Sequence, residues 1–237
     1  MSSYGGNQFS GLVGLSYNLE TTAFTGTNPL ADGPNNYVVS SSIMNTIFET
    51  DALTAPFFAL AISRDESNTG YGGVLTIGEL PDLADPRVNA SPDFVSAVIE
   101  PGAYGYTAYE INADISYGTQ ELSASIAGPM QWLVDSGTTL LHFPAQDAAA
   151  FNALWEPPPT SMEGANWAVE CDATPPILVV DISGVSFTVN PLDLVRRVNG
   201  VCYSGVIAAP AGYGAILGTV FLRNVLAVFD WGDGSMQ

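Results

Sequence analysis

Short apolar runs separated by turn residues recur along the whole chain. Examples are PFFALAIS at 56–63, QWLVD at 131–135 and PILVVDI at 176–182, and the 24 glycines and 16 prolines are spread between such runs. Runs of this length bounded by glycine and proline are typical of buried β-strands. The sequence therefore predicts an all-β fold. Short helices are expected only at 42–53, 144–155 and 192–198, and Ser42 is placed to cap the first of them.

The charge balance limits the partners of this chain. It has 24 acidic residues against five arginines and no lysine, which gives a net charge of −19. Phosphate groups would repel such a surface, so we expect neither nucleic acid nor an anionic membrane as a partner. No apolar run approaches the length of a membrane-spanning helix. The acidic composition fits a protein that works in acid, where most carboxylates lose their charge, or one whose surface only keeps it soluble.

Several single residues bear on secretion and metal binding. Cys171 and Cys202 permit one disulfide but do not require it, and Asn89 begins an N-glycosylation sequon. His142 is the only histidine, so no metal site is expected. The first residues, MSSYGGNQFSG, lack the features of a signal peptide. We therefore expect either a protein that is not secreted or a chain that lacks its true beginning.

The segment QWLVDSGTTLLHFP at 131–144 places a carboxylate between two apolar runs. Ser136, Gly137 and Thr138 can donate hydrogen bonds to Asp135 within one tight turn, and Gly137 eases the turn itself. A carboxylate held in this way suits general acid–base chemistry on water. An isolated Asp-Ser-Gly also occurs as a purely structural turn, and the loop alone does not distinguish the two roles.

This loop and its neighbours together resemble the pepsin-like aspartic proteases, in particular the fungal type. The resemblance rests on motifs that occur in the order of that family: FSGLVGL at 9–15, FFALAIS at 57–63, GGVLTIG at 72–78, DSGTT at 135–139, the hairpin at 176–188 and AILG at 215–218. It implies a bilobal, all-β acid-protease fold that is truncated here and has a few short helices. It further implies a remnant of the N-terminal lobe at 1–56, strands of the inter-lobe sheet at 57–80, and a C-terminal catalytic lobe at 81–237 with its last strand truncated.

An internal repeat suggests where a second aspartate belongs. FSGLVGLSY at 9–17 echoes YGAILGTVF at 213–221, and Gly218 follows Asp135 by 83 residues. If the lobes arose by duplication, the matching aspartate would precede Gly14 by a similar distance, about 69 residues before Met1. We therefore expect this chain to lack both the partner of Asp135 and the flap that covers the family's cleft.

The resemblance also implies a function and a set of roles. It implies an aspartic endopeptidase, extracellular or vacuolar, that binds peptide or protein substrates and activates water with an aspartate pair, without metal or cofactor. Asp135 would be the one catalytic residue that this chain carries, and Cys171 and Cys202 would form a disulfide. The expected substrate contacts are Leu133, Gly137, Thr138 and Thr139, and the expected supporting residues are Ser136, Ile216, Leu217 and Gly218.

Two other functions remain open at this point. One is a non-catalytic pseudo-protease or binding module on the same fold. The other is a homodimer in which two chains each donate Asp135. A remnant lobe would also expose apolar side chains, which favours self-association, and those side chains are Leu12, Val13, Leu15, Ile43, Ile47 and Phe48.

Overall fold

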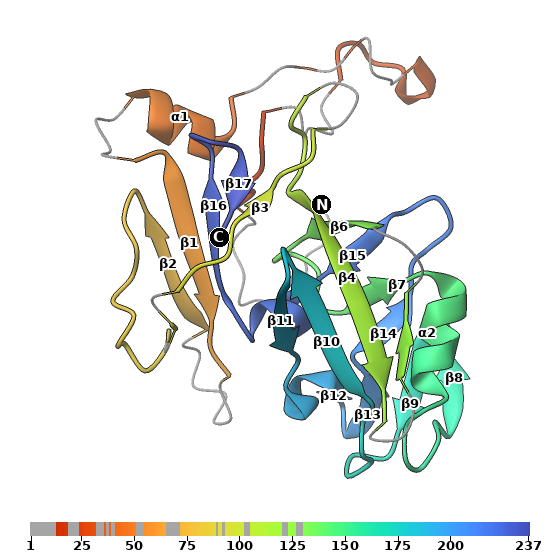
Figure 1. The fold of residues 1–237 in the computed structure, drawn as a ribbon. Coiled ribbons are helices and arrows are strands. Elements are labelled where there is room, and N and C mark those ends of the chain that lie inside the picture. Colours follow the sequence, from red (N-terminus) through yellow and green to blue (C-terminus); the bar gives the residue numbers. More distant parts are fainter. Residues whose placement is uncertain are drawn as a thin grey trace. The chain divides into compact units, whose positions relative to one another are not determined.

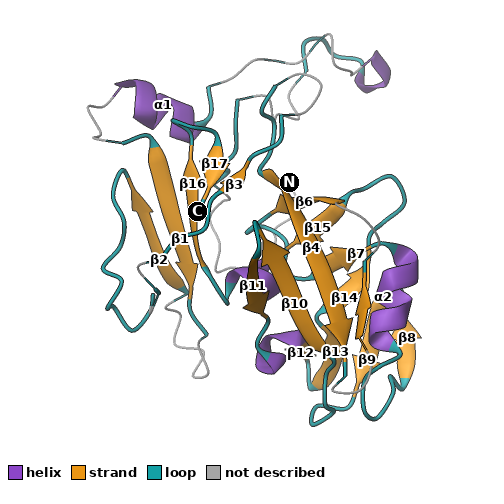
Figure 2. Cartoon of the chain, in the orientation of Figure 1, coloured by secondary structure: helices purple, strands orange, loops and turns teal. Residues whose placement is uncertain are grey.

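Strands dominate the structure, a computed structural model (Figure 2). The prediction of an all-β fold with a few short helices is confirmed. The chain divides into two compact units, residues 1–53 with 101–108 and residues 54–100 with 109–237. The division at 56/57 and 80/81 that the resemblance implies stays a prediction. The structure describes residues 13–18, 24–31, 36, 38, 41–50, 55–64, 72–88, 90–91, 93–101, 105–119, 123–126 and 130–237.

The first unit has little regular structure among its described residues, namely η1 (Pro29–Ala31) and α1 (Ile43–Thr50). The Ser42 hydroxyl accepts the N–H of Asn45 at 3.1 Å, which confirms Ser42 as the cap of α1. Val13 and Ile43 are exposed. Leu12 and the Asn89 sequon lie outside the described residues, and self-association stays a prediction.

The first sheet of the second unit has five strands, from both the beginning and the end of that unit (Figure 1). Its order is β2-β1-β16-β17-β3, so the end of the chain pairs with segments from its first half. The stacked rings of Phe58 and Phe229, with centroids 4.5 Å apart, pack between β1 and β16. The strands are β1 (Phe57–Ile62), β2 (Gly73–Ile77), β3 (Ala97–Val98), β16 (Leu226–Asp230) and β17 (Ser235–Met236).

An eight-stranded sheet carries the candidate site. Its order is β11-β10-β4-β6-β15-β7-β14, with β5 paired to β4. In β10, Leu178, Val180 and Ile182 are buried while the intervening residues are less so, which is the period of two expected of a strand. The remaining strands are β4 (Glu110–Gly118), β5 (Ser123–Ser125), β6 (Met130–Val134), β7 (Leu141–Phe143), β11 (Val185–Thr188), β14 (Val206–Ala208) and β15 (Ala215–Leu217), with β10 at Ile177–Ile182.

Aromatic side chains fill the core behind this sheet. Trp132 on β6 lies edge-on to Phe143 on β7, with centroids 5.6 Å apart. Phe143 in turn contacts Phe151 of helix α2 (Ala145–Asn152) at 6.0 Å. The Trp132 indole N–H donates to the Ala113 carbonyl at 3.0 Å, so its polar atom is satisfied in a fully buried position. These contacts fix β6 and β7, the two strands on either side of the Asp135 loop.

The third sheet corrects one prediction. Its order is β12-β13-β9-β8, with β8 (Ser161–Glu163), β9 (Asn166–Val169), β12 (Val195–Val198) and β13 (Val201–Ser204). The expected helix at 192–198 is wrong, because only η2 (Pro191–Leu194) is helical and the rest forms β12. Asn199 and Gly200 have φ of 50° and 85°, the left-handed values of a tight hairpin turn. This turn returns the chain as β13 and commits 195–198 to strand pairing.

Candidate functional site

Asp135 lies where buried strand β6 ends. Trp132 and Val134 point into the core, so Leu133 and Asp135 face the other way and are only half-buried. The backbone N–H of Asp135 donates to the Leu217 carbonyl at 3.1 Å. Leu217 belongs to β15, which runs parallel to β6 with Leu217 beside Val134. The aspartate is therefore set by two strands that are far apart in sequence.

Both oxygens of the Asp135 carboxylate accept hydrogen bonds from its own loop. The Gly137 N–H donates to Oδ1 at 2.8 Å, and the Thr138 hydroxyl donates to Oδ2 at 2.6 Å. The Thr138 N–H also donates to the Asp135 carbonyl at 3.3 Å, which closes the turn. Donors to an ionised acceptor give strong, directional hydrogen bonds. The carboxylate is thus oriented before any ligand arrives, while Ser136, Gly137 and Thr139 stay exposed around it.

Gly218 lets a second backbone segment pack closely against this loop. A Cβ built on Gly218 would lie 2.5 Å from the Thr138 carbonyl oxygen and closer still to that of Leu140. No side chain fits there, so the close approach of the two backbones requires glycine. Immediately after Gly218, the Thr219 N–H donates to Thr138 O at 2.8 Å and the Val220 N–H donates to Thr139 O at 3.1 Å. Helix α3 (Thr219–Leu222) therefore holds the carbonyl side of the Asp135 loop.

A row of side chains extends from the loop across the sheet, of which Leu133, His142 and Ile207 are half-buried and Ile216 is buried. Leu133 pairs with Ile216, and Ile216 pairs with His142, which itself lies beside Ile207 on β14. Paired residues on adjacent strands share a face, so these side chains lie on the same face as Asp135. The predicted supporting residues Ile216, Leu217 and Gly218 are thus brought next to the loop, and Leu133 borders it. The row offers an apolar surface beside an oriented carboxylate.

His142 is a titratable residue on the same face of the sheet as Asp135. Burial lowers the pKa of its imidazole, and the negative charge of Asp135 opposes that shift. Its Nδ1 is buried and has no hydrogen-bond partner among the described residues. In the same part of the chain, no group of three or more His, Cys, Asp or Glu side chains could hold a metal ion.

A cavity of about 510 Å³ lies elsewhere in the same unit. Its lining includes Arg64, Phe94 and Arg223 but not Asp135. The cavity offers volume, whereas the Asp135 loop offers an oriented carboxylate beside exposed residues. We favour the loop, because acid–base chemistry needs a positioned titratable group that can reach the reacting atoms.

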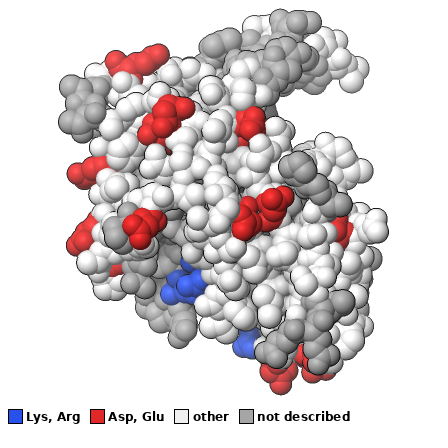
Figure 3. Space-filling view, in the orientation of Figure 1, with Lys and Arg blue, Asp and Glu red and all other residues white. Residues whose placement is uncertain are grey.

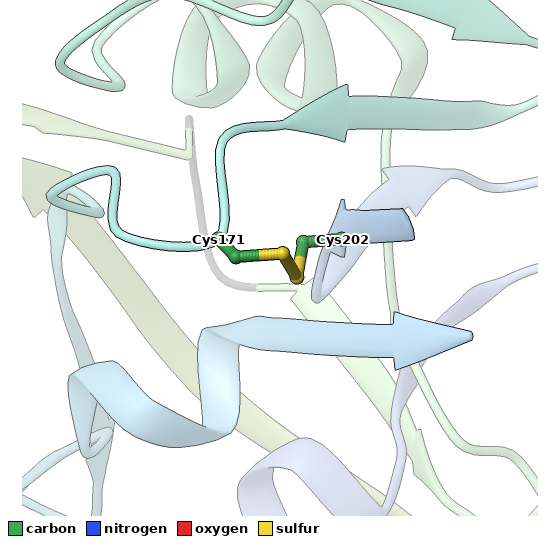
Figure 4. The surroundings of a disulfide bond; sticks show 2 residues. All are labelled: Cys171 and Cys202. Atoms are coloured by element: carbon green, nitrogen blue, oxygen red, sulfur yellow. A yellow bond between two sulfur atoms is a disulfide. The ribbon is translucent and has the colours of Figure 1, made fainter. Parts of the chain in front are cut away.

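The disulfide predicted from the resemblance is present. Cys171, which follows β9, bonds to Cys202 on β13 with a Cα–Cα distance of 5.2 Å (Figure 4). Cys202 is buried, and it pairs with Val169 in the register of β9 and β13. The disulfide therefore cross-links the third sheet, at residues distant in sequence from the Asp135 loop.

Among the described residues, no helix has the length and apolar character needed to cross a lipid bilayer.

Sequence reasoning missed two parts of this site. It did not find the role of Thr219, whose N–H and hydroxyl bond the carbonyls of Thr138 and Thr139, the latter at 3.1 Å. It also did not find Asn224, which closes the far end of α3. For Thr219, the signal was a threonine directly after the apolar pair and glycine at 216–218. Asn224 gave no local signal, because its partners Arg64 and Asp193 are far from it in the chain.

Comparison with known proteins gives a consistent result. The family model for eukaryotic aspartyl protease matches residues 2–237. A protein of Aspergillus fumigatus named Probable aspartic-type endopeptidase is 34% identical over 99% of this chain and 54% of its own length. Pepsin A of Bos taurus is 26% identical over 96% of this chain and 55% of its own. Probable vacuolar protease A of Trichophyton verrucosum is 31% identical, over 44% of this chain and 27% of its own. The chain thus spans about half the length of the first two relatives.

Proposed function

The chain belongs to the eukaryotic aspartyl protease family, and we propose that it supplies one catalytic aspartate, Asp135, to an acid-active aspartic endopeptidase. One observation carries this proposal. Both carboxylate oxygens of Asp135 are held by donors at 2.8 and 2.6 Å in a loop that stays open to solvent. An aspartate with a purely structural role would need only the hydrogen bonds of its own turn. Here a second backbone segment, at Gly218, also packs closely against the loop.

The proposed reaction needs a second carboxylate close to Asp135. Two carboxylates at such a distance share one proton, so one acts as base while the other acts as acid. The ionised member takes a proton from a bound water, which attacks the peptide carbonyl carbon. The protonated member gives its proton to the carbonyl oxygen. The carboxyl that took the water's proton then gives it to the amide nitrogen, the other carboxylate takes a proton from a hydroxyl of the tetrahedral intermediate, and the C–N bond breaks. The relatives extend well beyond the part that this chain matches, at 54% and 55% of their length, and we propose that the second carboxylate belongs to a region outside the given sequence.

The substrate is a peptide or protein bound in an extended form. Gly137 and Thr139 are exposed on the loop and would bond the peptide backbone, as in strand-like recognition. Leu133 and Ile216 form an apolar surface next to Asp135 and would receive a bulky apolar side chain. Leu217 supports the loop by accepting the Asp135 N–H at 3.1 Å, and the supporting role of Ser136 stays a prediction. The protease therefore prefers bonds flanked by large apolar residues.

The working environment is acidic, in the extracellular space or a vacuole. Acidic side chains are spread over the visible face rather than gathered at one place, and basic ones are few (Figure 3). At low pH these carboxylates lose their charge and their mutual repulsion falls. The same pH leaves one proton on the aspartate pair. The chain is therefore suited to acid in both its surface and its chemistry.

The test compares two proteins: this chain alone, and this chain joined behind the N-terminal part of the Aspergillus fumigatus relative. Both are assayed for hydrolysis of an acid-denatured protein at about pH 3–4, where an aspartate pair holds one proton. We expect the joined protein to be active and Asp135→Asn to lower its rate at least about 100-fold. Asp181→Asn is the control, because Ile182 separates Asp181 from the Ser-Gly pair that follows it, and its carboxylate accepts a hydrogen bond from the Ser186 hydroxyl of the next strand at 2.8 Å.

Three results would overturn the proposal. Activity of the joined protein that survives Asp135→Asn would remove Asp135 from the mechanism. Activity of this chain alone, rising with the square of its concentration and lost on Asp135→Asn, would show that two copies pool Asp135. A joined protein that folds, binds a statine inhibitor and never cleaves would favour a binding module instead.

A further inference from the structure

Asn224, just beyond helix α3, joins three separate segments through one side chain. Its Nδ2 donates to the Asp193 carboxylate at 3.1 Å and to the Val220 carbonyl at 2.9 Å. Its Oδ1 accepts from the Arg64 guanidinium at 2.6 Å and from the Asn190 N–H at 2.9 Å. An amide side chain offers two donors and two lone pairs, and here all four are used. Such a saturated side chain has one orientation.

The partners of Asn224 are themselves firmly placed. Asp193 on η2 has a side chain only 3% exposed, and Arg64 Nε donates to it at 2.8 Å while Arg223 lies 3.8 Å away. A carboxylate this buried is costly unless cations and donors surround it, so the cluster resists rearrangement. Arg64 follows β1 in the five-stranded sheet, whereas Asp193 lies between β11 and β12. The cluster therefore ties one end of α3 to two other parts of the unit.

The opposite end of α3 holds the Asp135 loop. Thr219 and Val220 donate their N–H groups to the carbonyls of Thr138 and Thr139 at 2.8 and 3.1 Å. Between the two ends lies a single helical turn of four residues, Thr219–Leu222, closed by the bond from Arg223 N–H to Thr219 O at 3.0 Å. A turn this short has no room to absorb a displacement internally. Movement at Asn224 is therefore transmitted to the carbonyls beneath Asp135.

We propose that Asn224 is a positioning residue for the catalytic carboxylate: it anchors α3 to the Arg64–Asp193 pair, and α3 in turn fixes the loop that orients Asp135. This inference rests on the proposed function of Asp135. It assigns a role in catalysis to a side chain that contacts neither substrate nor the reacting atoms. The five-stranded sheet thereby contributes to the geometry of the site through Arg64.

The first measurement needs no activity. Hydrogen exchange of the Thr219 and Val220 amides is followed in this chain with Asn224, with Asn224→Ala and with Asn112→Ala. Asn112 is the matched control, because its amide makes an exposed side-chain bond to Glu100 at 2.7 Å. We expect Asn224→Ala to speed exchange at both amides about tenfold or more, since the bonds to the loop open more often. Unchanged exchange at these two amides would overturn the proposal.

The second measurement uses the joined protein, at temperatures well below the unfolding transition of each variant. We expect Asn224→Ala to lower kcat about 10–100-fold, because a small misplacement of a reacting group costs that much. KM should stay within about twofold, since the apolar face around Leu133 belongs to β6 and not to α3. Asn224→Asp keeps the acceptor for Arg64 but repels Asp193, and should fall between the wild type and the alanine variant.

The outcomes separate the two proposals. Faster exchange with an unchanged kcat would overturn the positioning role while leaving the function of Asp135 intact. A fall in kcat that matches only the loss of folded protein would mark a merely structural role and would also overturn it. Activity that survives Asp135→Asn would instead refute the proposed function, whatever the exchange data show.

Discussion

Replacing Gly218 by alanine tests the central packing contact of the site. The φ of Gly218 is −86°, which any residue adopts, so the substitution causes no backbone strain and acts only through the added methyl. That methyl would lie 2.5 Å from Thr138 O, whereas an ordinary contact needs 3.4 Å or more. The two backbone segments must therefore separate by about 1 Å. The obstructing atoms are the carbonyl oxygens of Thr138 and Leu140, which belong to the main chain and cannot rotate away as a side chain could.

The size of the effect follows from what the separation breaks. Overpacking in a closely packed region costs about 1–3 kcal/mol. The bonds from the Thr219 and Val220 N–H groups to the loop would stretch as well, and each is worth about 0.5–1.5 kcal/mol. Together these give a loss of about 2–6 kcal/mol in the free energy of unfolding. In a chain of this size that lowers Tm by about 10 °C.

The assay is thermal unfolding of the whole chain followed by circular dichroism, which needs no catalytic activity. Gly214→Ala is the control, because among the described residues nothing lies within 4 Å of a Cβ built there. The control should leave Tm unchanged or raise it slightly, since alanine restricts the unfolded chain. A Gly218→Ala variant that melts within about 2 °C of the wild type would refute the argument that this contact holds the loop.

Three further predictions concern the same unit. Replacing Cys171 and Cys202 by alanine should lower the free energy of unfolding by about 3–4 kcal/mol, because the bond closes a loop with a separation of 31 residues; an unchanged urea midpoint would contradict this. Burial lowers the pKa of His142 below its ordinary value of 6.5, so the unfolded state binds the proton more tightly and the free energy of unfolding falls as pH drops below that value. In urea unfolding at about pH 7.5 and 5, His142→Gln should lose less stability between the two pH values than the wild type loses. An equal loss in the two proteins would exclude His142 as the cause. Thr138→Val removes the 2.6 Å bond to Asp135 and should lower kcat of the joined protein about tenfold, with about 1 kcal/mol lost in stability; an unchanged kcat would show that this hydroxyl does not orient the carboxylate.

Local patterns in the sequence predicted the parts of the fold that local physics determines. The apolar runs at 57–62 and 177–182 became β1 and β10, and the alanine-rich stretch after Pro144 became α2 at Ala145–Asn152. The donors around Asp135 were readable because they lie within three residues of it. In each case the interactions that decide the structure connect near neighbours in the chain.

The failures occurred where distant partners decide. Residues 192–198 have apolar spacing compatible with a helix, but Val195 and Val198 pair with Ser204 and Val201 across a hairpin. The Asn199–Gly200 pair was the available signal for that turn, because both residues adopt positive φ readily. Asn224 gave no such signal, since its value lies in contacts with Arg64 and Asp193, which are 160 and 31 residues away.

The placement of the few cations suggests how so acidic a chain keeps its contacts in acid. Among the described residues the ion pairs involve Arg64, Arg87 and Arg223, and they engage only Asp85 and Asp193. Hydrogen bonds from Arg87 lower the pKa of Asp85 to about 2 from its ordinary 3.8, so the contribution of this pair is present above 3.8 and is lost only as pH falls through about 2. The pair lies at the surface, with the Arg87 side chain 51% and the Asp85 side chain 23% exposed, so it serves to keep a turn in shape rather than to stabilise the fold.

The other carboxylates therefore face a different balance at low pH. Among the described residues only Asp85 and Asp193 are paired with a cation, so protonation of the other described carboxylates removes repulsion between them without breaking an ion pair. Asp193 differs, because its buried carboxylate accepts hydrogen bonds from Arg64 and from Asn224, which follows helix α3. A chain that depended on many such pairs would come apart in acid. Among the described residues this dependence is concentrated at one buried cluster, the one that we propose positions Asp135.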